Sequence, residues 1–201
     1  MVNFKIEVIV LPVSDVDRAK DFYGKLGFRE DVDYHGPNGF RLVHFTPPGS
    51  AASLLFGHGI TAAEPGSAQG VHMVVDDIVA ARDELVSRGV LVSEVYHDAG
   101  GVFHHAGRKD RVPGLQPERR SYGSFATFTD PDGNLFTLQE VTERHPGRIT
   151  QVVYGSVAEV EQALRAAAIA HGKHEEELGH ADAEWPAWYA AYMARAAGLE
   201  S

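Results

Sequence analysis

Side chains that could transfer protons gather in the middle of the chain. His72 lies in a short apolar run, whereas His104 and His105 are adjacent in a long polar segment that ends just before Tyr122. Imidazole titrates near neutral pH, so it can act as a general acid, a general base or a metal ligand. We therefore predict His72, His104, His105 and Tyr122 as catalytic candidates. The alternative interpretation makes His72 a hydrogen-bonded structural histidine and Tyr122 an ordinary strand aromatic.

Basic side chains gather in the same polar segment, although the protein carries a formal net charge of −10. The segment contains Arg108, Lys109, Arg111, Arg119 and Arg120. Because a guanidinium matches a carboxylate bidentately, one hypothesis is a lid that recruits an anionic ligand, with Arg108 and Arg111 as ligand-binding residues. The alternative is a solvated loop whose cations pair with nearby Asp110 and Glu118.

Two stretches of the chain nearly repeat each other and predict the elements that position these residues. Segment 13–28 matches segment 75–90, sixty-two residues further along. Each begins with a VSD or VDD triplet, continues as an amphipathic run and reaches a glycine, which predicts a capped helix and its stop. In the first copy Ser14 is the predicted N-cap. We expect the strands of this copy at residues 4–10, 28–34, 40–46 and 52–56.

The second copy follows the same order with a longer connection. We predict a strand at 71–75, a helix at 77–88, a strand at 90–96 and a polar loop at 97–120. Loops of this length are often binding segments or lids. The DPDGN segment at 130–134 then separates two runs of β-branched and aromatic residues. Proline pre-sets one turn dihedral, and glycine and asparagine tolerate a positive φ, so this segment predicts a β-hairpin.

This order of elements, occurring twice, resembles the vicinal oxygen chelate superfamily, the glyoxalase, bleomycin-resistance and extradiol-dioxygenase group. The resemblance covers roughly residues 4–145. It implies an α+β fold in which two tandem βαβββ modules form curved mixed sheets around a cavity. We expect the modules at 1–57 and 70–145. The two modules could close the cavity within one chain or swap across a homodimer.

The resemblance also implies positions for metal ligands, and the motif spacing assigns them to Val8, Ser53, Gly70 and Thr137. None of these is a good metal ligand, so we expect the standard divalent metal site to be absent. Because strand side chains alternate, His72 and Gln139 should face the cavity two residues beyond Gly70 and Thr137. A displaced site centred on His72 therefore stays open, and the cofactor is unknown. Further ligand-binding candidates are His44, Gln139 and Phe125.

Residues 150–201 predict a helical C-terminal extension with a capping box at Ser156 and Glu159 and a second helix near Trp185. Its tryptophans and tyrosines are typical of a docking face, directed at the modules or at a partner. His171, His174 and His180 with Glu175–Glu177 suggest a metal site, and the alternative is an exposed, charged helix end.

The composition of the chain argues against some classes of binding partner. The acidic net charge argues against nucleic acid, and no apolar run is long enough to predict a membrane span. The absence of cysteine excludes disulfides and thiolate ligands, so a cytoplasmic location is the default expectation. Two functions that involve a small-molecule ligand therefore remain for this protein. One is a glyoxalase-like lyase, isomerase or dioxygenase acting on a small oxygen-rich molecule. The other is a metal-free protein, similar to the bleomycin-resistance branch, that sequesters an aromatic or cationic molecule. An interaction module based on the extension is a third.

Overall fold

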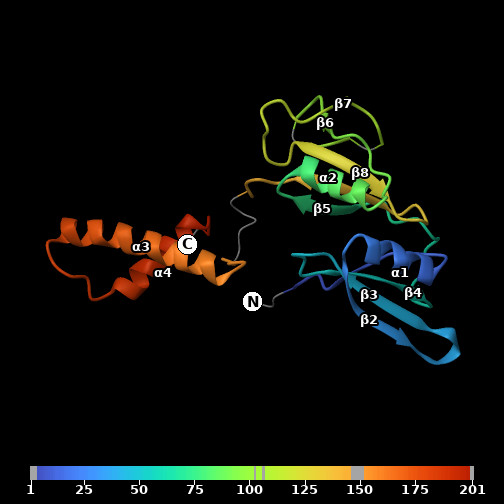
Figure 1. Ribbon diagram of the computed structural model, residues 1–201, viewed down its shortest axis with the longest axis horizontal. Helices are drawn as coiled ribbons and strands as arrows, with labels where there is room; N and C mark the ends of the chain where they lie inside the picture. The colour runs from blue at the N-terminus through green and yellow to red at the C-terminus, as the bar shows by residue number, and fades with distance from the viewer. Residues whose placement is uncertain (1–3, 102, 106, 146–151, 200–201) are drawn as a thin grey trace. The chain divides into compact units, whose positions relative to one another are not determined.

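The computed structural model describes residues 4–101, 103–105, 107–145 and 152–199. The chain divides into two compact units, residues 1–142 and 143–201. The first unit holds two sheets and two helices, and the second holds two helices (Figure 1). None of the helices in the described residues combines the length and hydropathy needed to cross a bilayer.

The first sheet has four strands in the order β1-β4-β3-β2. Strands β2 (Arg29–His35), β3 (Arg41–Thr46) and β4 (Ser53–His58) are antiparallel neighbours, with a single turn of 3₁₀-helix, η1 (Pro37–Gly39), between β2 and β3. Strand β1 (Val8–Val10) pairs in parallel with β4 and is shorter than the predicted strand at 4–10. Helix α1 (Val16–Lys25) follows β1, so this part of the chain has the predicted βαβββ order.

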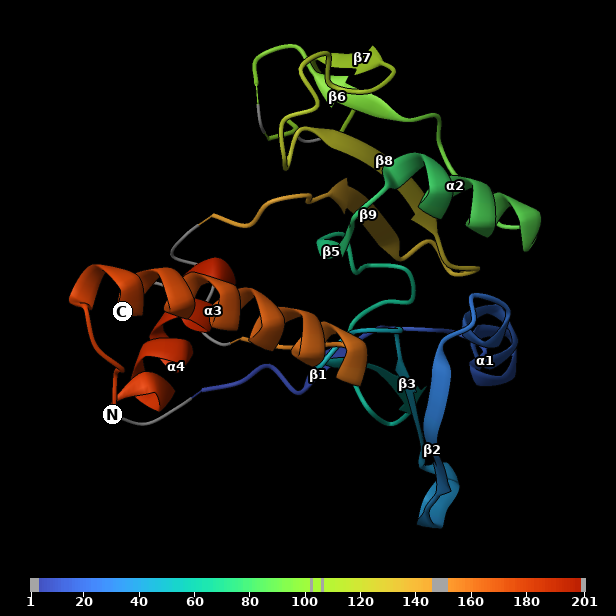
Figure 2. The same cartoon turned by 60° about the vertical axis from the view of Figure 1, so that its left-hand side comes forward.

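The second sheet has five strands in the order β5-β9-β8-β6-β7. Strand β5 (Val71–Val75) is parallel to β9 (Leu135–Glu140), which is antiparallel to β8 (Ser124–Thr129). Figure 2 shows helix α2 (Ile78–Ser87) alongside β8. The two mixed sheets confirm the predicted α+β fold class.

The connection before β8 differs from its prediction. No strand spans 90–96, where Val92 makes one isolated bridge to Phe128. The predicted loop at 97–120 instead contributes to β6 (Tyr96–Asp98) and forms β7 (Arg111–Pro113), which extend the sheet at one edge. The physical cause lies at Ser93, whose carbonyl accepts a hydrogen bond from Arg82 and whose hydroxyl accepts one from the Thr127 amide. These bonds replace the regular strand ladder.

Asp15, and not Ser14, caps helix α1. The Asp15 carboxylate accepts the Arg18 amide at 3.0 Å, whereas the Ser14 hydroxyl donates to Asp132 in the β8–β9 turn. In the second copy Asp77, which lies sixty-two residues after Asp15, caps α2 and accepts the amides of Val79 and Ala80. A carboxylate at the N-cap also interacts favourably with the helix dipole, which explains why aspartate takes this position twice.

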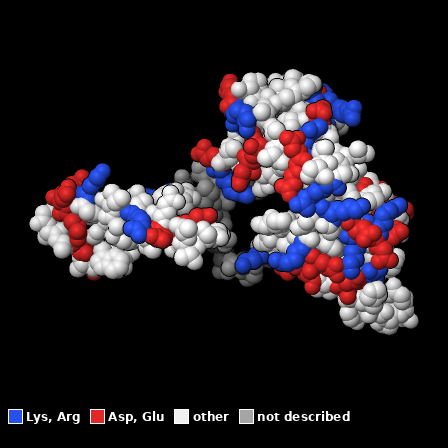
Figure 3. All heavy atoms as spheres, viewed as in Figure 1, with Lys and Arg blue, Asp and Glu red and all other residues white. Residues whose placement is uncertain are grey.

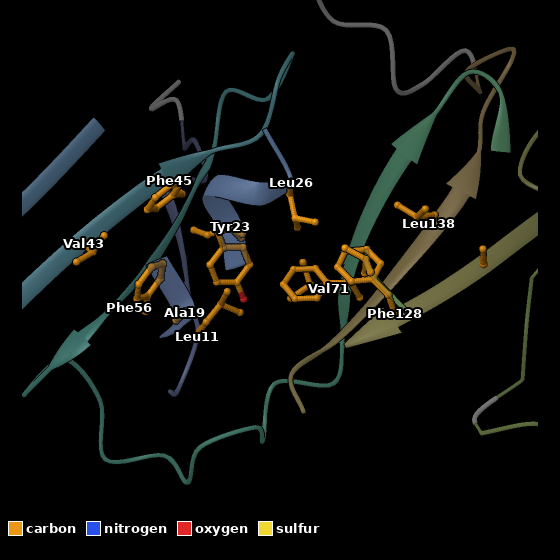
Figure 4. Close-up of a cluster of buried hydrophobic side chains, with 14 of the residues drawn as sticks. Leu11, Ala19, Tyr23, Leu26, Val43, Phe45, Phe56, Val71, Phe128 and Leu138 are labelled. Carbon is orange, nitrogen blue, oxygen red and sulfur yellow. The ribbon is translucent and has the colours of Figure 1, made fainter. Parts of the chain in front are cut away.

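A common hydrophobic core joins the two sheets through α1 (Figure 4). Tyr23 of α1 is fully buried, and its ring centre lies 5.3 Å from that of Phe56 in the first sheet and 6.1 Å from that of Phe136 in the second. Phe22 approaches Phe128 of β8 at 6.5 Å. The face of the second sheet that carries Phe128 and Phe136 is therefore filled by apolar side chains.

Hydrogen bonds of the DPDGN turn stabilise this core. The Asp130 carboxylate accepts the backbone amides of residues 132–134 through one oxygen and the Tyr23 hydroxyl, at 2.8 Å, through the other. The Asn134 side chain donates to the carbonyl of Pro12 and accepts the amide of Ala68. One predicted turn thus ties together the strand-to-helix connection of the first copy and the linker between the copies.

The second unit is a helical hairpin of α3 (Val157–Leu178) and α4 (Trp185–Ala196). Ser156 caps α3 by accepting the Glu159 amide, and Gly179 ends it in the left-handed conformation. The predicted starts of both helices are confirmed. Figure 3 shows basic and acidic side chains interspersed over the visible face of the sheet-bearing unit. This agrees with ion pairs such as Arg41–Asp33 at 2.8 Å.

Candidate functional site

The face of the second sheet that points away from the common core carries the candidate chemistry. The register pairs His72 with Thr137 on β9, and Gln139 of the same strand with Phe125 of β8. Phe125 in turn pairs with Tyr96 of β6. Because paired residues share a face and neighbours along a strand alternate, these side chains lie on one side of the sheet. Gln139 thus shares a face with His72, as the sequence predicted.

Four rings on this face form a continuous row, which we call the aromatic row: Tyr96, Phe125, His104 and His72. The Tyr96 and Phe125 rings are stacked with centres 5.7 Å apart, and His104 meets Phe125 edge-on at 5.1 Å. His104 is also stacked on His72 at 5.3 Å. Since β9 separates β5 from β8, the His104 ring spans β9 and covers the buried Phe125. The row therefore combines rings from three strands with one ring from the β6–β7 loop.

Arg111 closes the row at the β7 edge. Its guanidinium carbon lies 4.0 Å above the centre of the Tyr96 ring, a cation–π contact. The Tyr96 hydroxyl and the Arg111 Nε are both buried, and neither has a hydrogen-bond partner in the described residues. Buried donors are normally satisfied, so this pair of orphaned donors requires an explanation.

Partial burial, followed by the proximity of His104, lowers the pKa of His72 below its usual value and so favours the neutral imidazole. A neutral imidazole can stack on an apolar ring without the cost of desolvating a charge.

The register revises the position expected from motif spacing. Thr137 lies opposite His72 and not opposite Gly70, just as Ser53 lies opposite Val8 in the first sheet. His72 lies three positions before the valine of the VDD triplet, whereas Val8 lies five positions before the valine of the VSD triplet. The connection from strand to triplet is therefore two residues shorter in the second copy. For this reason the equal spacing predicted Gly70, two residues before the position that the register gives.

A divalent metal site of the kind implied by the resemblance does not fit these residues. The paired positions offer one imidazole, two hydroxyls and one valine, whereas transition metals and zinc require three or four nitrogen, carboxylate or sulfur ligands. No group of three histidine or acidic side chains in the described residues is arranged to hold a metal ion. Within the described residues, His72 therefore has no two neighbouring histidine or acidic side chains with which it could form a displaced metal site.

His105 does not join the row and instead pairs with a carboxylate. Its Nδ1 lies 2.7 Å from an oxygen of the buried Asp98, which also accepts the amides of Gly100 and His105. The hydrogen bond from the His105 side chain is the main cause that lowers the pKa of Asp98. This arrangement orients the imidazole, which a general base requires, but it also anchors the loop.

The Gln139 side chain binds the backbone of Tyr122. Its side-chain amide donates to the carbonyl of Tyr122 at 2.9 Å, and the backbone amide of Tyr122 donates to the carbonyl of Glu140. Tyr122 has a φ of 68°, a conformation that is costly for a non-glycine residue and marks a tight turn before β8. The structure therefore gives Gln139 a role in holding this turn.

The remaining candidates lie elsewhere. His44 is on β3 of the first sheet, and Arg108 is exposed in a turn of the β6–β7 loop. Arg120 pairs with Glu118, and Arg119 reaches the fully buried Glu140, so these two cations have partners within the protein. Tyr96 and Asp98 are not among the predicted site residues, because both become site residues only when the polar loop folds onto the sheet.

In the helical unit, the predicted histidine cluster is a packing arrangement. His171 is buried, with Nε2 3.1 Å from Asp182, and its ring contacts those of Trp188 and Tyr189. His174 stacks on Trp188 at 5.5 Å. These contacts hold α3 against α4.

The sheet-bearing part of the chain is similar to known proteins. The family model described as the Glyoxalase/Bleomycin resistance protein/Dioxygenase superfamily matches residues 5–138, so α3 and α4 lie outside it. No curated protein matches the chain.

Solved structures also resemble this chain over part of its length. TnmS3, an antibiotic binding protein from Streptomyces sp. CB03234, is 30% identical with a TM-score of 0.51, and the match covers 70% of this chain and 98% of that one. A member of the same superfamily from Sphaerobacter thermophilus DSM 20745 is 27% identical with a TM-score of 0.51, covering 69% and 98%.

Proposed function

Because the chain belongs to the glyoxalase/bleomycin resistance protein/dioxygenase superfamily, we propose that it binds a planar aromatic small molecule without a metal. The ligand lies on the face of the second sheet that points away from the common core, between His72 and Phe125. The aromatic row is the observation that carries this proposal, because stacked and edge-on rings at 5.1–5.7 Å offer the contacts that aromatic ligands use.

In this proposal the ligand takes the place of the His104 ring. His104 comes from a loop, so its ring can leave the row without disturbing the ladder of β5, β9 and β8. Its departure uncovers Phe125 and leaves His72 as the opposite wall. The neutral state of His72 favours stacking against a flat, uncharged ring.

Two further observations support binding. The donor set at the metal positions does not fit a divalent ion, which removes the support for a dioxygenase. A protein described as antibiotic binding is also 30% identical in a match that covers 70% of this chain.

The test is isothermal titration calorimetry with 2-naphthamide, a flat and neutral probe. We expect one molecule per chain. His72→Ala should weaken binding about three- to tenfold, the range of one aromatic contact. His104→Ala should strengthen binding by a similar factor, because it removes the ring that competes with the ligand.

The matched control is His58→Ala, which removes an exposed histidine from the end of β4 in the first sheet. Its affinity should equal that of the wild type. A 2-naphthamide affinity that neither His72→Ala nor His104→Ala alters would refute this binding mode.

A second candidate function is acid–base catalysis on a small oxygen-rich substrate, favoured by the pairing of His105 with the buried Asp98. A fixed imidazole could exchange the proton next to a carbonyl group. Deuterium exchange of dihydroxyacetone, followed by NMR, tests this. We expect His105→Ala to slow the exchange about a hundredfold if His105 is the base. A wild-type rate equal to that of buffer would exclude this activity for that substrate.

A further inference from the structure

The orphaned donors at the end of the aromatic row indicate what chemical group the ligand carries. The Tyr96 side chain is only 4% exposed, and its hydroxyl has no hydrogen-bond partner in the described residues. Leaving a buried donor unsatisfied is unfavourable, because the donor loses its hydrogen bond to water on burial and gains none in return. Burial raises the pKa of Tyr96, so the hydroxyl stays protonated and available to donate.

Arg111 presents the same situation with a full charge. Its Nε is buried without a partner, and no carboxylate of the described residues lies within 4.0 Å of its guanidinium. Eight other arginines of this acidic protein have carboxylate partners: Arg18, Arg29, Arg41, Arg82, Arg88, Arg119, Arg120 and Arg165. A partly buried guanidinium without a counter-charge is unfavourable, so an anion from outside the chain would stabilise it.

The acid nearest in the ladder is already engaged. Asp98 lies opposite Arg111 in the β6–β7 pairing, but its oxygens accept from His105 and two backbone amides. Arg111 lies over the Tyr96 ring, and its buried Nε has no partner in the described residues. Two unpaired buried donors, one of them cationic, thus lie at the same end of the row of rings.

We infer that Arg111 and Tyr96 form a subsite for an acidic oxygen group on the aromatic ligand, such as a carboxylate. This inference rests on the proposed function, since the ring of the same ligand occupies the row. The guanidinium donates to the anion and supplies its counter-charge, and the Tyr96 hydroxyl donates a further hydrogen bond. His104 contacts Phe125, and Phe125 stacks on Tyr96, so the acidic group of a ligand in the place of His104 has to reach past Phe125 to these two donors. The ligand class is therefore a planar aromatic acid.

The experiment compares 2-naphthoate with the neutral, similarly shaped 2-naphthamide by calorimetry at neutral pH. We expect the wild type to bind 2-naphthoate at least about tenfold more tightly, since hydrogen bonds to charged groups are strong. Arg111→Met should remove this preference and leave the affinity for 2-naphthamide within about twofold. Tyr96→Phe keeps the stacked ring and should weaken only 2-naphthoate, by several-fold.

Arg108→Met is the matched control. It removes one arginine from the same loop without touching the aromatic row, so the preference for 2-naphthoate should persist. Thermal unfolding of each variant shows whether it is folded, and the comparison on the wild type needs no variant at all. Equal affinities of the wild type for both probes would overturn the acidic subsite and leave the proposed function standing. A preference that survives Arg111→Met would also overturn it. Failure of both probes to bind would overturn both proposals.

Discussion

The hydrogen bond between Tyr23 and Asp130 allows a quantitative test of how the two sheets are joined. Tyr23→Phe removes the hydroxyl that donates to the Asp130 carboxylate at 2.8 Å and leaves the ring in the core. Tyr23 is fully buried and Asp130 is 4% exposed, so water cannot replace the lost donor. Burial, together with the charge of Asp130, raises the pKa of Tyr23 and keeps this donor protonated.

The expected cost follows from the type of bond. A hydrogen bond to a charged group contributes about 1.5–3 kcal/mol. For a unit of about 140 residues, each kcal/mol lowers the unfolding temperature by about 3–4 °C, so the variant should unfold about 5–10 °C earlier. The Asn134 side chain still donates to the same Asp130 oxygen, which keeps the cost below the full desolvation of a carboxylate.

The assay must separate the two units. Both tryptophans, Trp185 and Trp188, lie in the helical unit, so tryptophan fluorescence reports on that unit alone. Amide hydrogen exchange over β8 and β9, measured by mass spectrometry, reports on the sheets. We expect faster exchange in these strands and an unchanged fluorescence transition.

Tyr34→Phe is the matched control, because Tyr34 is 54% exposed and removal of its hydroxyl should change stability by less than about 0.5 kcal/mol. If Tyr23→Phe costs no more than this control, the bond to Asp130 does not stabilise the joint between the sheets.

Three further predictions concern the site and the linker. NMR titration should give His72 a pKa below 6.5, because partial burial and then His104 disfavour the imidazolium; His104→Ala should raise that pKa, and an unchanged value would contradict this cause. His105→Ala should raise the pKa of Asp98, which can be followed through its carboxyl carbon. Because the pKa of Asp98 is lowered in the folded protein, its contribution to stability is present above about pH 4 and is lost as the pH falls through the lowered pKa. Wild type should therefore lose more stability than His105→Ala in urea titrations below about pH 4, and equal losses would contradict the pairing. Gly66→Ala should cost about 2–4 kcal/mol in urea denaturation, because at a φ of 78° a Cβ would lie 2.0 Å from a carbonyl oxygen of the β8–β9 turn; a cost below about 1 kcal/mol would refute this contact.

Local signals in the sequence predicted much of the fold. The VSD and VDD triplets located both helices, because an aspartate N-cap satisfies free amides of the first turn within a few residues. Gly27 and Gly89 have φ values of 77° and 81°, as expected of glycines that end helices. The DPDGN turn likewise depends on bonds within five residues.

Non-local bonds account for the predictions that differ from the structure. Residues 90–96 have strand-like composition, but Arg82, eleven positions earlier, takes the carbonyl of Ser93. The Ser14 hydroxyl is a reasonable cap, yet it donates its hydrogen bond to Asp132, 118 positions later. In both cases a partner distant in sequence competes with the local pattern, and composition contains no information about that partner.

Local pattern predicts some residues of the candidate site and misses others. Strand alternation correctly placed His72 and Gln139 on one face. His104 and Arg111, which were predicted as a catalytic and a ligand-binding candidate, come from the polar loop. Tyr96 and Asp98 were missed because a loop of this length gives no sign of which residues pair across it. Only the β6–β7 ladder sets Asp98 opposite Arg111.

The repeated strands and the β6–β7 segment supply different side chains of the candidate site, and this matters for specificity. The strands β5, β8 and β9 supply His72 and Phe125, and these strands owe their stability to the core on their other face. The β6–β7 segment supplies Tyr96, His104 and Arg111, and few of its side chains belong to that core. Changes in this segment can therefore alter the ring that covers the site and the charge at its end at small cost to the sheets. Ligand preference should follow the β6–β7 segment, whereas stability should follow the turn and the helix caps.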